Sequence, residues 1–547
     1  MGNRKNHIYT MLGLTLLSPI LMSIPFIIPH CGLISLFAIV PLLLMERIAS
    51  KNNIKRVWVW HYSAFVLWNT LTTFWVCNAT IGGGIFAILA NALQMSIIFG
   101  TFRLSKKVFN GTLPYIFLAA MWITWERAYF SAQISWPWLV LGNSFARTVS
   151  VIQWYEFTGS LGGSLWIWAV NLSVFGIICT ILEGNFIKFN IKAKAATIIC
   201  TVLLIGCPIL LSERMYNNYK EHKNPLEVLI VQPNIDPYHK FTALSQEEQN
   251  QILINLAEAK LKDTSDTPLL IIAPETFTND IVTNDIGAGL SYRTFQKFIE
   301  RHPNTNLLFG ASSYTYSFSN AAPSYNARKV EDGVWVESHN SAIITDATGR
   351  ADIFHKSKLV VGVEMTPYPA FFTKIDNLLG NVMGRCIGQK EISTLDFISY
   401  NKDSSIKCRI PIGCAICYES VYGEYCTGYI RKGAKALAVI TNDAWWGNTP
   451  GYRQHLSYSS LRAIETRRDI ARCANTGISA IINQRGDIVK KTSWWKTDTL
   501  AGKINLNNKI TFFVKNGDII GRISSFIFIL LLLSMAIRLY TNRQTNS

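Results

Sequence analysis

Long apolar runs dominate the first 212 residues of the chain, and one more run lies near its C-terminal end. Most of the eight runs are close to the roughly 20 residues that an α-helix needs to cross a bilayer, although the second is short. They lie at 8–29, 31–46, 57–77, 81–102, 113–130, 161–182, 195–212 and 519–539. A signal peptide is the alternative for the first run, but further runs follow it and no clear small-residue cleavage site does. We therefore expect eight transmembrane helices.

The basic residues between these runs predict how the chain crosses the membrane. If the N-terminus lies inside, the turns after the second, fourth and sixth spans and the C-terminal tail should also be basic. These segments carry Arg47, Lys51, Lys55 and Arg56, then Arg103, Lys106 and Lys107, then Lys188, Lys192 and Lys194, and finally Arg538 and Arg543. The turns at 29–31 and 78–84 have no Lys or Arg. This pattern places both termini in the cytoplasm and the long segment 213–518 outside it.

The segment 213–518 alternates short apolar stretches with helical patterns. We expect strands at 226–234, 268–275, 306–313, 339–346, 409–419, 434–443 and 477–484, and helices at 244–263 and 451–473. Continuous apolar strands separated by helices are typical of buried sheets covered by helices. The expected organisation is a membrane domain over 1–212, an extracytoplasmic α/β domain over 213–518, and a C-terminal transmembrane helix with a short cytoplasmic tail over 519–547.

Composition supports the membrane interpretation. Only 16% of the 547 residues are charged, whereas soluble domains carry roughly 25%. The net charge of +17 is spread over short loops, and no run of five Lys or Arg residues occurs. The positive charge is therefore better explained by membrane topology than by binding to nucleic acid, and we expect no nucleic-acid partner.

Three segments at the ends of expected strands carry residues with chemical potential. Glu275 follows an apolar strand, Lys356 lies in a short apolar and basic segment, and Cys417 follows another apolar strand. Each alone has an ordinary interpretation as a loop carboxylate, a surface lysine or a buried thiol. Together they supply a nucleophile, a general base and a cation that can stabilise an oxyanion. Their spacing alone does not establish that they meet.

Cys414 and Cys417 form a C-x-x-C pattern, which suggests a redox pair or half of a metal site as an alternative. No second C-x-x-C occurs, and residues three apart on an extended strand point to opposite faces, which disfavours a disulfide. We expect no metal and no cofactor. The pairing of the cysteines in the polar segment stays open, namely of Cys386, Cys408, Cys414, Cys426 and Cys473.

Several ordered motifs resemble those of the nitrilase superfamily over residues 226–515. They are PET at 274–276, the segment around Lys356, CYES at 417–420, TNDAWWG at 441–447, and RAIETRRDIARCANTGISAII at 462–482. The membrane spans narrow the resemblance to the apolipoprotein N-acyltransferase family, together with WPWLVLGN at 136–143, VQPNI at 231–235 and FFVKNGDIIG at 512–521. The resemblance implies an α-β-β-α sandwich that carries a Glu–Lys–Cys triad.

Residue by residue, the resemblance makes Glu275 the general base, Lys356 the oxyanion stabiliser and Cys417 the nucleophile. It further implies a supporting or substrate-binding role for Glu364, Tyr418, Glu419 and Phe241, and Trp445 and Trp446 are candidates for contact with acyl chains. The chain departs from the family at two places. Val361-Gly362-Val363 replaces the usual Pro-Phe-Gly before Glu364, and Phe241 occupies a position that is usually Trp.

The resemblance implies a two-step acyl transfer. Cys417 takes a fatty acyl chain from a phospholipid, and the N-terminal amine of a diacylglyceryl-modified apolipoprotein then takes it from the thioester. The implied location is the bacterial inner membrane, with the catalytic domain on the periplasmic side, and we expect a monomer. Two alternatives remain: a membrane-tethered amidase or nitrilase-type hydrolase, and a non-catalytic polytopic scaffold or transporter.

Overall fold

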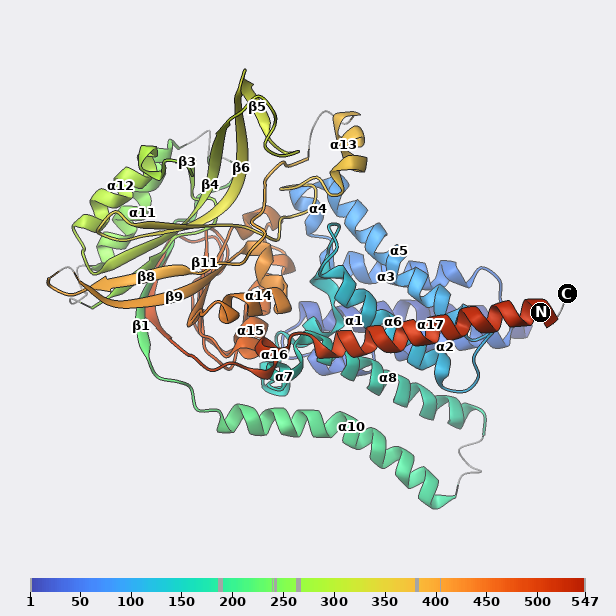
Figure 1. Ribbon diagram of the computed structural model, residues 1–547. Helices are drawn as coiled ribbons and strands as arrows, with labels where there is room; N and C mark the ends of the chain where they lie inside the picture. The colour runs from blue at the N-terminus through green and yellow to red at the C-terminus, as the bar shows by residue number, and fades with distance from the viewer. Residues whose placement is uncertain are drawn as a thin grey trace. The chain divides into compact units, whose positions relative to one another are not determined.

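The chain forms two compact units in the computed structural model, which describes residues 2–184, 190–238, 240, 244–261, 267–378, 383–403 and 405–545. Residues Met1–Tyr219 and Asn516–Ser547 make up a helical unit, and residues Lys220–Lys515 make up an α/β unit (Figure 1).

Every predicted apolar run forms helix. The helices of this unit are α1 (Gly2–Ile27), α2 (Val40–Lys51), which follows the 3-10 turn η1 (Gly32–Leu36), α3 (Val57–Thr73), α4 (Val76–Ala79), α5 (Ile81–Ser105), α6 (Leu113–Tyr129), α7 (Tyr155–Thr158), α8 (Ser160–Leu182), α10 (Ile191–Asn218) and α17 (Ile519–Thr545). Within the described residues, six stretches are long and apolar enough to cross a membrane: Lys5–Ile27, Gly32–Lys51, Ile81–Ser105, Ser160–Leu182, Ile191–Asn218 and Ile519–Asn542. The other two predicted spans form α3 and α6, each of 17 residues, which is the lower end of the length that spans a bilayer.

Ion pairs join several helices of this unit at their C-terminal ends. Lys106, which caps α5, donates to Glu46 of α2 at 2.6 Å, and Lys51 of α2 donates to Glu183, which caps α8, at 2.8 Å. The C-terminal ends of α2, α5 and α8 therefore meet. These are the ends where the charge pattern predicts basic turns.

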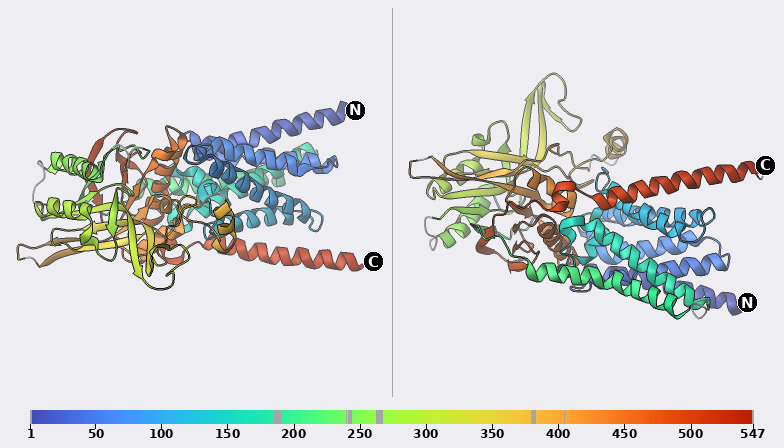
Figure 2. Two further views of the ribbon diagram at one scale, coloured as in Figure 1. Left: turned by 90° about the horizontal axis from the view of Figure 1, so that it is seen from above. Right: turned by 60° about the horizontal axis from the view of Figure 1, so that its bottom comes forward.

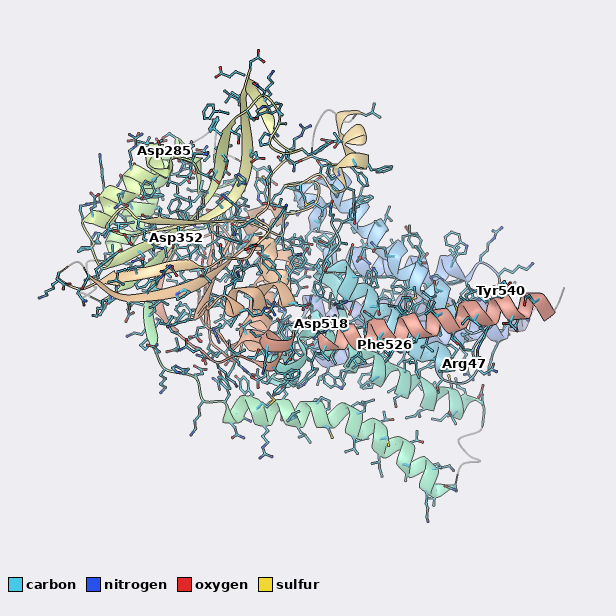
Figure 3. The ribbon with its side chains drawn as sticks, in the orientation of Figure 1. Arg47, Asp285, Asp352, Asp518, Phe526 and Tyr540 are labelled. Atoms are coloured by element: carbon cyan, nitrogen blue, oxygen red, sulfur yellow. The ribbon has the colours of Figure 1, made fainter. Side chains whose placement is uncertain are left out.

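The same end of the helical unit holds both chain termini (Figure 2). Arg47 lies toward the end where Tyr540 of α17 lies, whereas Asp518 lies at the opposite end of that helix (Figure 3). An arrangement in which both termini and the basic turns share one end is what an even number of crossings requires.

The α/β unit contains two sheets. The strands are β1 (Pro225–Gln232), β2 (Leu269–Ile272), β3 (Thr278–Val282), β4 (Thr305–Phe318), β5 (Arg328–Glu331), β6 (Val334–Thr345), β7 (Ala351–His355), β8 (Leu395–Tyr400), β9 (Ile406–Ile416), β10 (Ala436–Thr441), β11 (Ile470–Ala474), β12 (Ala480–Ile482), β13 (Ile488–Lys491) and β14 (Asp498–Asn505). The first sheet has the order β14-β1-β2-β4-β6-β5, with β3 paired to β4 and β7 paired to β6. The second has the order β13-β12-β11-β10-β9-β8.

Helices cover the outer face of each sheet. They are α11 (Gln246–Leu261) and α12 (Leu290–Glu300) on the first sheet, and α14 (Gly423–Arg431) and α15 (Pro450–Thr466) on the second (Figure 1). Two further helices, α13 (Pro369–Leu378) and α16 (Phe512–Asn516), lie outside these layers.

Alternation along β1 shows how the layers are built. Val228 and Ile230 pack with Ile416 of β9 in the core between the sheets, whereas Leu229 and Val231 pack against the layer of α11 and α12. Successive side chains of a strand point to opposite faces, so an unbroken apolar strand is buried on both. The result is an α-β-β-α sandwich, and the predicted α/β fold is confirmed.

The predicted helix at 451–473 is too long. Helix α15 ends at Thr466 because Arg467 adopts a left-handed conformation with φ of 51°, and the chain then enters β11. Ile470 of β11 pairs in parallel with Leu437 of β10. The sheet therefore takes up residues whose pattern continues that of the helix.

Candidate active site

Glu275 lies just beyond the end of β2, in a segment that rests directly on β4. The Ala273 amide donates to the Leu308 carbonyl at 2.8 Å, and the Gly310 amide donates to the Pro274 carbonyl at 3.1 Å. A Cβ atom on Gly310 would lie 2.6 Å from the Cα of Glu275, which is closer than van der Waals contact allows. Glycine at 310 is therefore what lets the backbone of Glu275 approach the sheet.

The two oxygens of Glu275 have different partners. Oε1 accepts from Nζ of Lys356 at 3.0 Å and from Nδ2 of Asn340 at 2.8 Å. Oε2 accepts from the backbone amide of Asn442 at 3.1 Å. The oxygen Oε1 is thus held by two side-chain donors, while Oε2 faces the end of β10.

Lys356 follows β7 and is almost completely buried. Its amide donates to the Asn340 carbonyl at 2.8 Å, and its Nζ also donates to Oε1 of Glu364 at 2.9 Å. Burial alone would lower the pKa of Lys356, but the carboxylates of Glu275 and Glu364 outweigh it and raise the pKa well above its ordinary value. Lys356 is therefore a permanent cation in this site.

Asn340 on β6 joins the two carboxylates. Its single Nδ2 donates to Oε1 of Glu275 at 2.8 Å and to Oε1 of Glu364 at 2.7 Å, so the amide and Lys356 bridge the same pair of oxygens. Sequence reasoning missed Asn340. Asn is normally depleted in strands, but Asn340 stands among other polar residues in the sequence ESHNS, so the pattern does not single it out.

The segment Val361-Gly362-Val363, which departs from the family pattern, forms a tight turn. Gly362 has φ of 79°, and its amide donates to the Met365 carbonyl at 2.8 Å. The Val360 amide in turn donates to Oε2 of Glu364 at 2.7 Å. Val361-Gly362-Val363 thus forms a turn that presents Glu364 to Lys356.

Cys417 is the first residue after β9 and has φ of 50°, a conformation that is strained for any residue other than glycine. Strand β9 pairs in parallel with β10, with Ile416 opposite Ile440, so Cys417 and Asn442 lie at the same edge of the sheet. Since Asn442 holds Oε2 of Glu275, the base and the thiol come from opposite sheets to one place.

Burial, followed by the negative charge of Glu275, raises the pKa of the Cys417 thiol well above its ordinary value, although Lys356 and the Thr441 hydroxyl act in the opposite direction. Only 9% of Cys417 is exposed. The resting group is therefore a thiol, and an attack by sulfur requires a base to remove its proton.

Glu419 does not line an open pocket but is completely buried beneath the site. It accepts from the amide of Ile416 at 2.8 Å, from the amide of Ser357 at 2.7 Å and from the Tyr425 hydroxyl at 2.7 Å. It therefore ties the segment after Lys356 to the segment before Cys417. Its neighbour Tyr418 is buried with its ring edge-on to that of Tyr422, at 5.2 Å between centroids.

The three aromatic candidates lie in different settings. Trp445 is 39% exposed and contacts the ring of Tyr238 edge-on, at 5.2 Å between centroids. Trp446 is partly buried and packs against His455, with 5.5 Å between the centroids of the two rings. Phe241 lies outside the described residues.

The C-x-x-C pattern raised a redox pair or half of a metal site as an alternative, and the pairing of the other cysteines was open. All eleven cysteines lie in the described part of the chain, and all are free, including Cys414 and Cys417. In that same part of the chain, no group of three or more His, Cys, Asp or Glu residues could hold a metal ion.

The sandwich and the cluster of Glu275, Lys356 and Cys417 define a carbon–nitrogen hydrolase domain attached to membrane-spanning helices. The family model of the carbon-nitrogen hydrolases matches residues 307–510, which include Lys356 and Cys417. A second model, the apolipoprotein N-acyltransferase N-terminal domain, matches residues 18–173. The chain belongs to the apolipoprotein N-acyltransferase family.

Curated relatives match nearly the whole chain. A protein of Chlorobaculum tepidum named apolipoprotein N-acyltransferase is 28% identical over 536 residues, which are 96% of each chain. One of the same name from Geobacter metallireducens is 25% identical over 517 residues, covering 92% of this chain and 91% of the relative.

Solved structures with a similar fold include Nit3 of Saccharomyces cerevisiae, a member of the nitrilase superfamily. It is 15% identical with a TM-score of 0.35 and covers 52% of this chain and 92% of its own. A carbon-nitrogen hydrolase from Helicobacter pylori is 14% identical with a TM-score of 0.34 and covers 56% of this chain and 94% of its own.

Proposed function

We propose that this protein is a phospholipid:apolipoprotein N-acyltransferase that works through a thioester on Cys417. It moves a fatty acyl chain from a phospholipid to the amine of the N-terminal diacylglyceryl-cysteine of a lipoprotein. The observation that carries the proposal is the meeting of the three residues between the sheets: Lys356 donates to Glu275, and Glu275 accepts from Asn442 at the sheet edge that carries Cys417. The relatives that match over nearly their full length support the choice of reaction.

In the first step, Glu275 takes the proton of the Cys417 thiol and the sulfur attacks the ester carbonyl of the phospholipid. The carbonyl oxygen becomes negative, and the ammonium of Lys356 stabilises it. The carbon–oxygen bond to glycerol then breaks. The protonated Glu275 returns the proton to the leaving alkoxide, so that a lysophospholipid departs and the acyl group stays on sulfur.

In the second step, the free amine of the lipoprotein attacks the thioester carbonyl, and Glu275 takes one of its protons. The carbon–sulfur bond breaks, an amide is left on the lipoprotein, and the proton passes to sulfur to restore the thiol. The two substrates react in turn, which predicts ping-pong kinetics. Water must be kept from the thioester between the steps, because hydrolysis would release a fatty acid instead.

The contacts of Glu275 indicate which of its oxygens handles the proton. Oε1 already accepts from both Lys356 and Asn340, so its lone pairs are occupied. Oε2 accepts from the Asn442 amide, and Asn442 lies at the sheet edge that also carries Cys417. We assign the proton transfer to Oε2.

We further propose that the protein works as a monomer in the bacterial inner membrane, with the α/β unit on the periplasmic side. The charge pattern of the loops and the shared end of both termini support this orientation. Both substrates are held in a bilayer, so the attachment to membrane helices brings the catalytic unit to its substrates.

A hydrolase is the second candidate, because the matched catalytic family is that of the carbon-nitrogen hydrolases. Both reactions form the same thioester and differ in whether water or an amine attacks it.

The proposal is tested by mass spectrometry of the intact protein after incubation with phospholipid alone, with Cys417→Ala as the control. We expect a mass increase of one acyl group that hydroxylamine removes and that Cys417→Ala lacks. A folded protein whose Cys417 can be alkylated but that gains no acyl group would contradict the proposal.

A further inference from the structure

A buried polar network lies behind Cys417, and the mechanism above does not use it. His455 of α15 is completely buried. Its Nε2 lies 3.0 Å from the Cys417 carbonyl oxygen and 3.0 Å from Oγ of Ser420. Its Nδ1 lies 2.9 Å from Oδ1 of Asp443 and 3.1 Å from Nη2 of Arg472.

The partners of His455 determine where its proton lies. The hydroxyl of Ser420 donates its own hydrogen to the Cys417 carbonyl at 2.7 Å, so toward His455 it can only accept. A carbonyl oxygen also only accepts. Nε2 of His455 therefore carries a hydrogen, whether Nδ1 accepts from Arg472 in a neutral ring or donates to Asp443 in a charged one.

Asp443 and Arg472 hold the other side of the imidazole. Nη2 of Arg472 donates to Oδ2 of Asp443 at 2.7 Å, and the Thr441 hydroxyl donates to Oδ1 at 2.8 Å. Both charged side chains are completely buried, and the pair sits on strand β11 and the turn after β10. The imidazole is thereby fixed in place with its Nε2–H toward Cys417.

Two donors thus hold one carbonyl, that of the residue whose backbone is strained. The φ of 50° at Cys417 persists only if surrounding contacts enforce it. The peptide group is planar and trans, so the N–H of Tyr418 points to the side opposite the Cys417 carbonyl. Fixing the carbonyl toward His455 and Ser420 therefore fixes the direction of that N–H.

We propose that His455 is a positioning residue for acyl transfer, which orients the Cys417–Tyr418 peptide so that its N–H serves with Lys356 as the oxyanion donor. The inference rests on the proposed function, because it takes Cys417 as the nucleophile. An amide of the residue after a nucleophile is a position from which oxyanions are stabilised in other acyl-transfer sites. His455 itself touches the backbone of Cys417 and no reacting atom.

This role separates two reactions of the same sulfur. Acylation by an ester develops an oxyanion, whereas alkylation by iodoacetamide displaces iodide and develops none. Loss of the oriented peptide should therefore slow acylation and leave alkylation nearly unchanged. A role in stability alone would affect both through the folded fraction.

The test compares His455→Phe, which removes the donor, with His455→Gln, whose amide nitrogen can replace Nε2–H. The full chain is used in detergent with a phospholipid donor, and both rates are measured by intact mass. We expect His455→Phe to lower the rate constant of acylation about 100-fold, which is the lower range for loss of an oxyanion donor, with little change in KM. Alkylation should stay within about threefold, and His455→Gln should recover most of the acylation.

His302→Phe is the matched control, since His302 lies at the end of α12 and should leave both rates unchanged. If His455→Phe does not fold, Ser420→Ala removes the second donor to the same carbonyl and should lower acylation selectively by a smaller factor. Unchanged acylation in His455→Phe, or in Ser420→Ala when it replaces that variant, would overturn the inference, as would a parallel loss of acylation and alkylation. Failure of the wild type to acylate at all would instead count against the proposed function.

Discussion

At the scale of single residues, the site is arranged around the amide of Asn340. Two carboxylates, Glu275 and Glu364, share a single lysine, so the buried cluster would carry an uncompensated negative charge. Nδ2 of Asn340 donates to both carboxylates and lowers the cost of holding them together. The side chain must be neutral and must carry two hydrogens on one atom, which an amide does and a carboxylate does not.

Asn340→Asp should therefore abolish most of the activity. A third carboxylate beside Glu275 and Glu364 places like charges together, and it removes the amide hydrogens that hold Oε1 of Glu275. We expect acylation of Cys417 to fall at least 100-fold at neutral pH, a loss on the scale of a catalytic proton acceptor. The measurement is the rate of acyl-enzyme formation.

Asn401→Asp makes the same change in an exposed turn and should behave like the wild type. An Asn340→Asp protein that acylates Cys417 at the wild-type rate would show that the amide does not act on Glu275.

Asp443 provides a pH test of the network behind Cys417. Burial alone would raise its pKa, but Arg472 and then His455 outweigh burial and hold the pKa at about 2, below the ordinary 3.8. The stability that this carboxylate contributes is thus fully present above pH 3.8 and is lost as the pH falls toward 2. The difference between the two pKa values corresponds to about 2 kcal/mol.

Asp443→Asn should therefore lower the free energy of unfolding of the α/β unit by about 2 kcal/mol at neutral pH, and by progressively less below pH 4. Denaturant unfolding in detergent, followed at several pH values, measures this. Asp285→Asn, at an exposed turn, should change neither the free energy of unfolding nor its dependence on pH. Equal destabilisation of Asp443→Asn at all pH values would mean that its charge is not what stabilises the network.

The three residues of the triad could be predicted from the sequence because they lie in ordered motifs at the ends of apolar strands. Asn340 could not, since a single polar residue in HNSAIITD has no feature that distinguishes it from any other polar residue of a strand. The role of His455 could not be predicted either. Its partners are Asp443, 12 residues before it, Arg472, 17 residues after it, and the carbonyl of Cys417. Local spacing in the sequence does not show these contacts.

At the scale of elements, the site depends on how closely strand ends can approach. The segment of Glu275 rests on β4 at Gly310, where a Cβ atom would meet the backbone of residues 274–276 at 2.6 Å. The backbone of neither element can move without disturbing its sheet, so a side chain at 310 must displace the base.

Gly310→Ala should therefore reduce acylation at least 100-fold and destabilise the α/β unit by about 1–3 kcal/mol, as overpacking does. Gly287→Ala is the matched control, because the nearest atom to its Cβ lies at an ordinary 3.6 Å. Acylation rates and thermal unfolding of the two variants are compared. Wild-type acylation by Gly310→Ala would contradict the close approach of the two elements.

Most central strands could be predicted, whereas the edge strands β5, β8, β13 and β14 could not. Strands β1 and β10 and the second half of β9 are buried on both faces, and their apolar pattern is read directly from the sequence. All residues of β5 and β13 are exposed, so they have no apolar run to reveal them. The error at 451–473 arose because Arg467, Arg468 and Arg472 fit a helix pattern, although Arg472 lies in β11 and is buried beside Asp443.

At the scale of the whole molecule, the chain joins a bundle of apolar helices to a catalytic sandwich. The ion pairs of Glu46 and Glu183 lie at one end of the helical unit, and the basic loops lie at the same end. Hydropathy predicts the helices, and the distribution of Lys and Arg predicts their direction, because both properties act locally and can be read from the sequence.

The proposed orientation predicts which positions a membrane-impermeant maleimide can reach in intact cells whose outer membrane has been permeabilised. Asp285→Cys, in an exposed turn of the α/β unit, should be labelled. Lys55→Cys, in the basic turn after α2, should be labelled only after the inner membrane is opened. Wild-type protein gives the background from the native cysteines. Labelling of Lys55→Cys in cells with an intact inner membrane would reverse the orientation.

The most direct test of the account is the fate of the acyl group once it is on Cys417. Acyl-enzyme is prepared with a labelled phospholipid, freed of donor, and mixed with a peptide that begins with diacylglyceryl-cysteine. The label is then followed into amide and into free fatty acid. An N-acyltransferase should move the label to the N-terminal amine of the peptide, and its thioester should persist when no peptide is added. Rapid release of free fatty acid, with or without the peptide, would contradict the proposed function and identify a hydrolase.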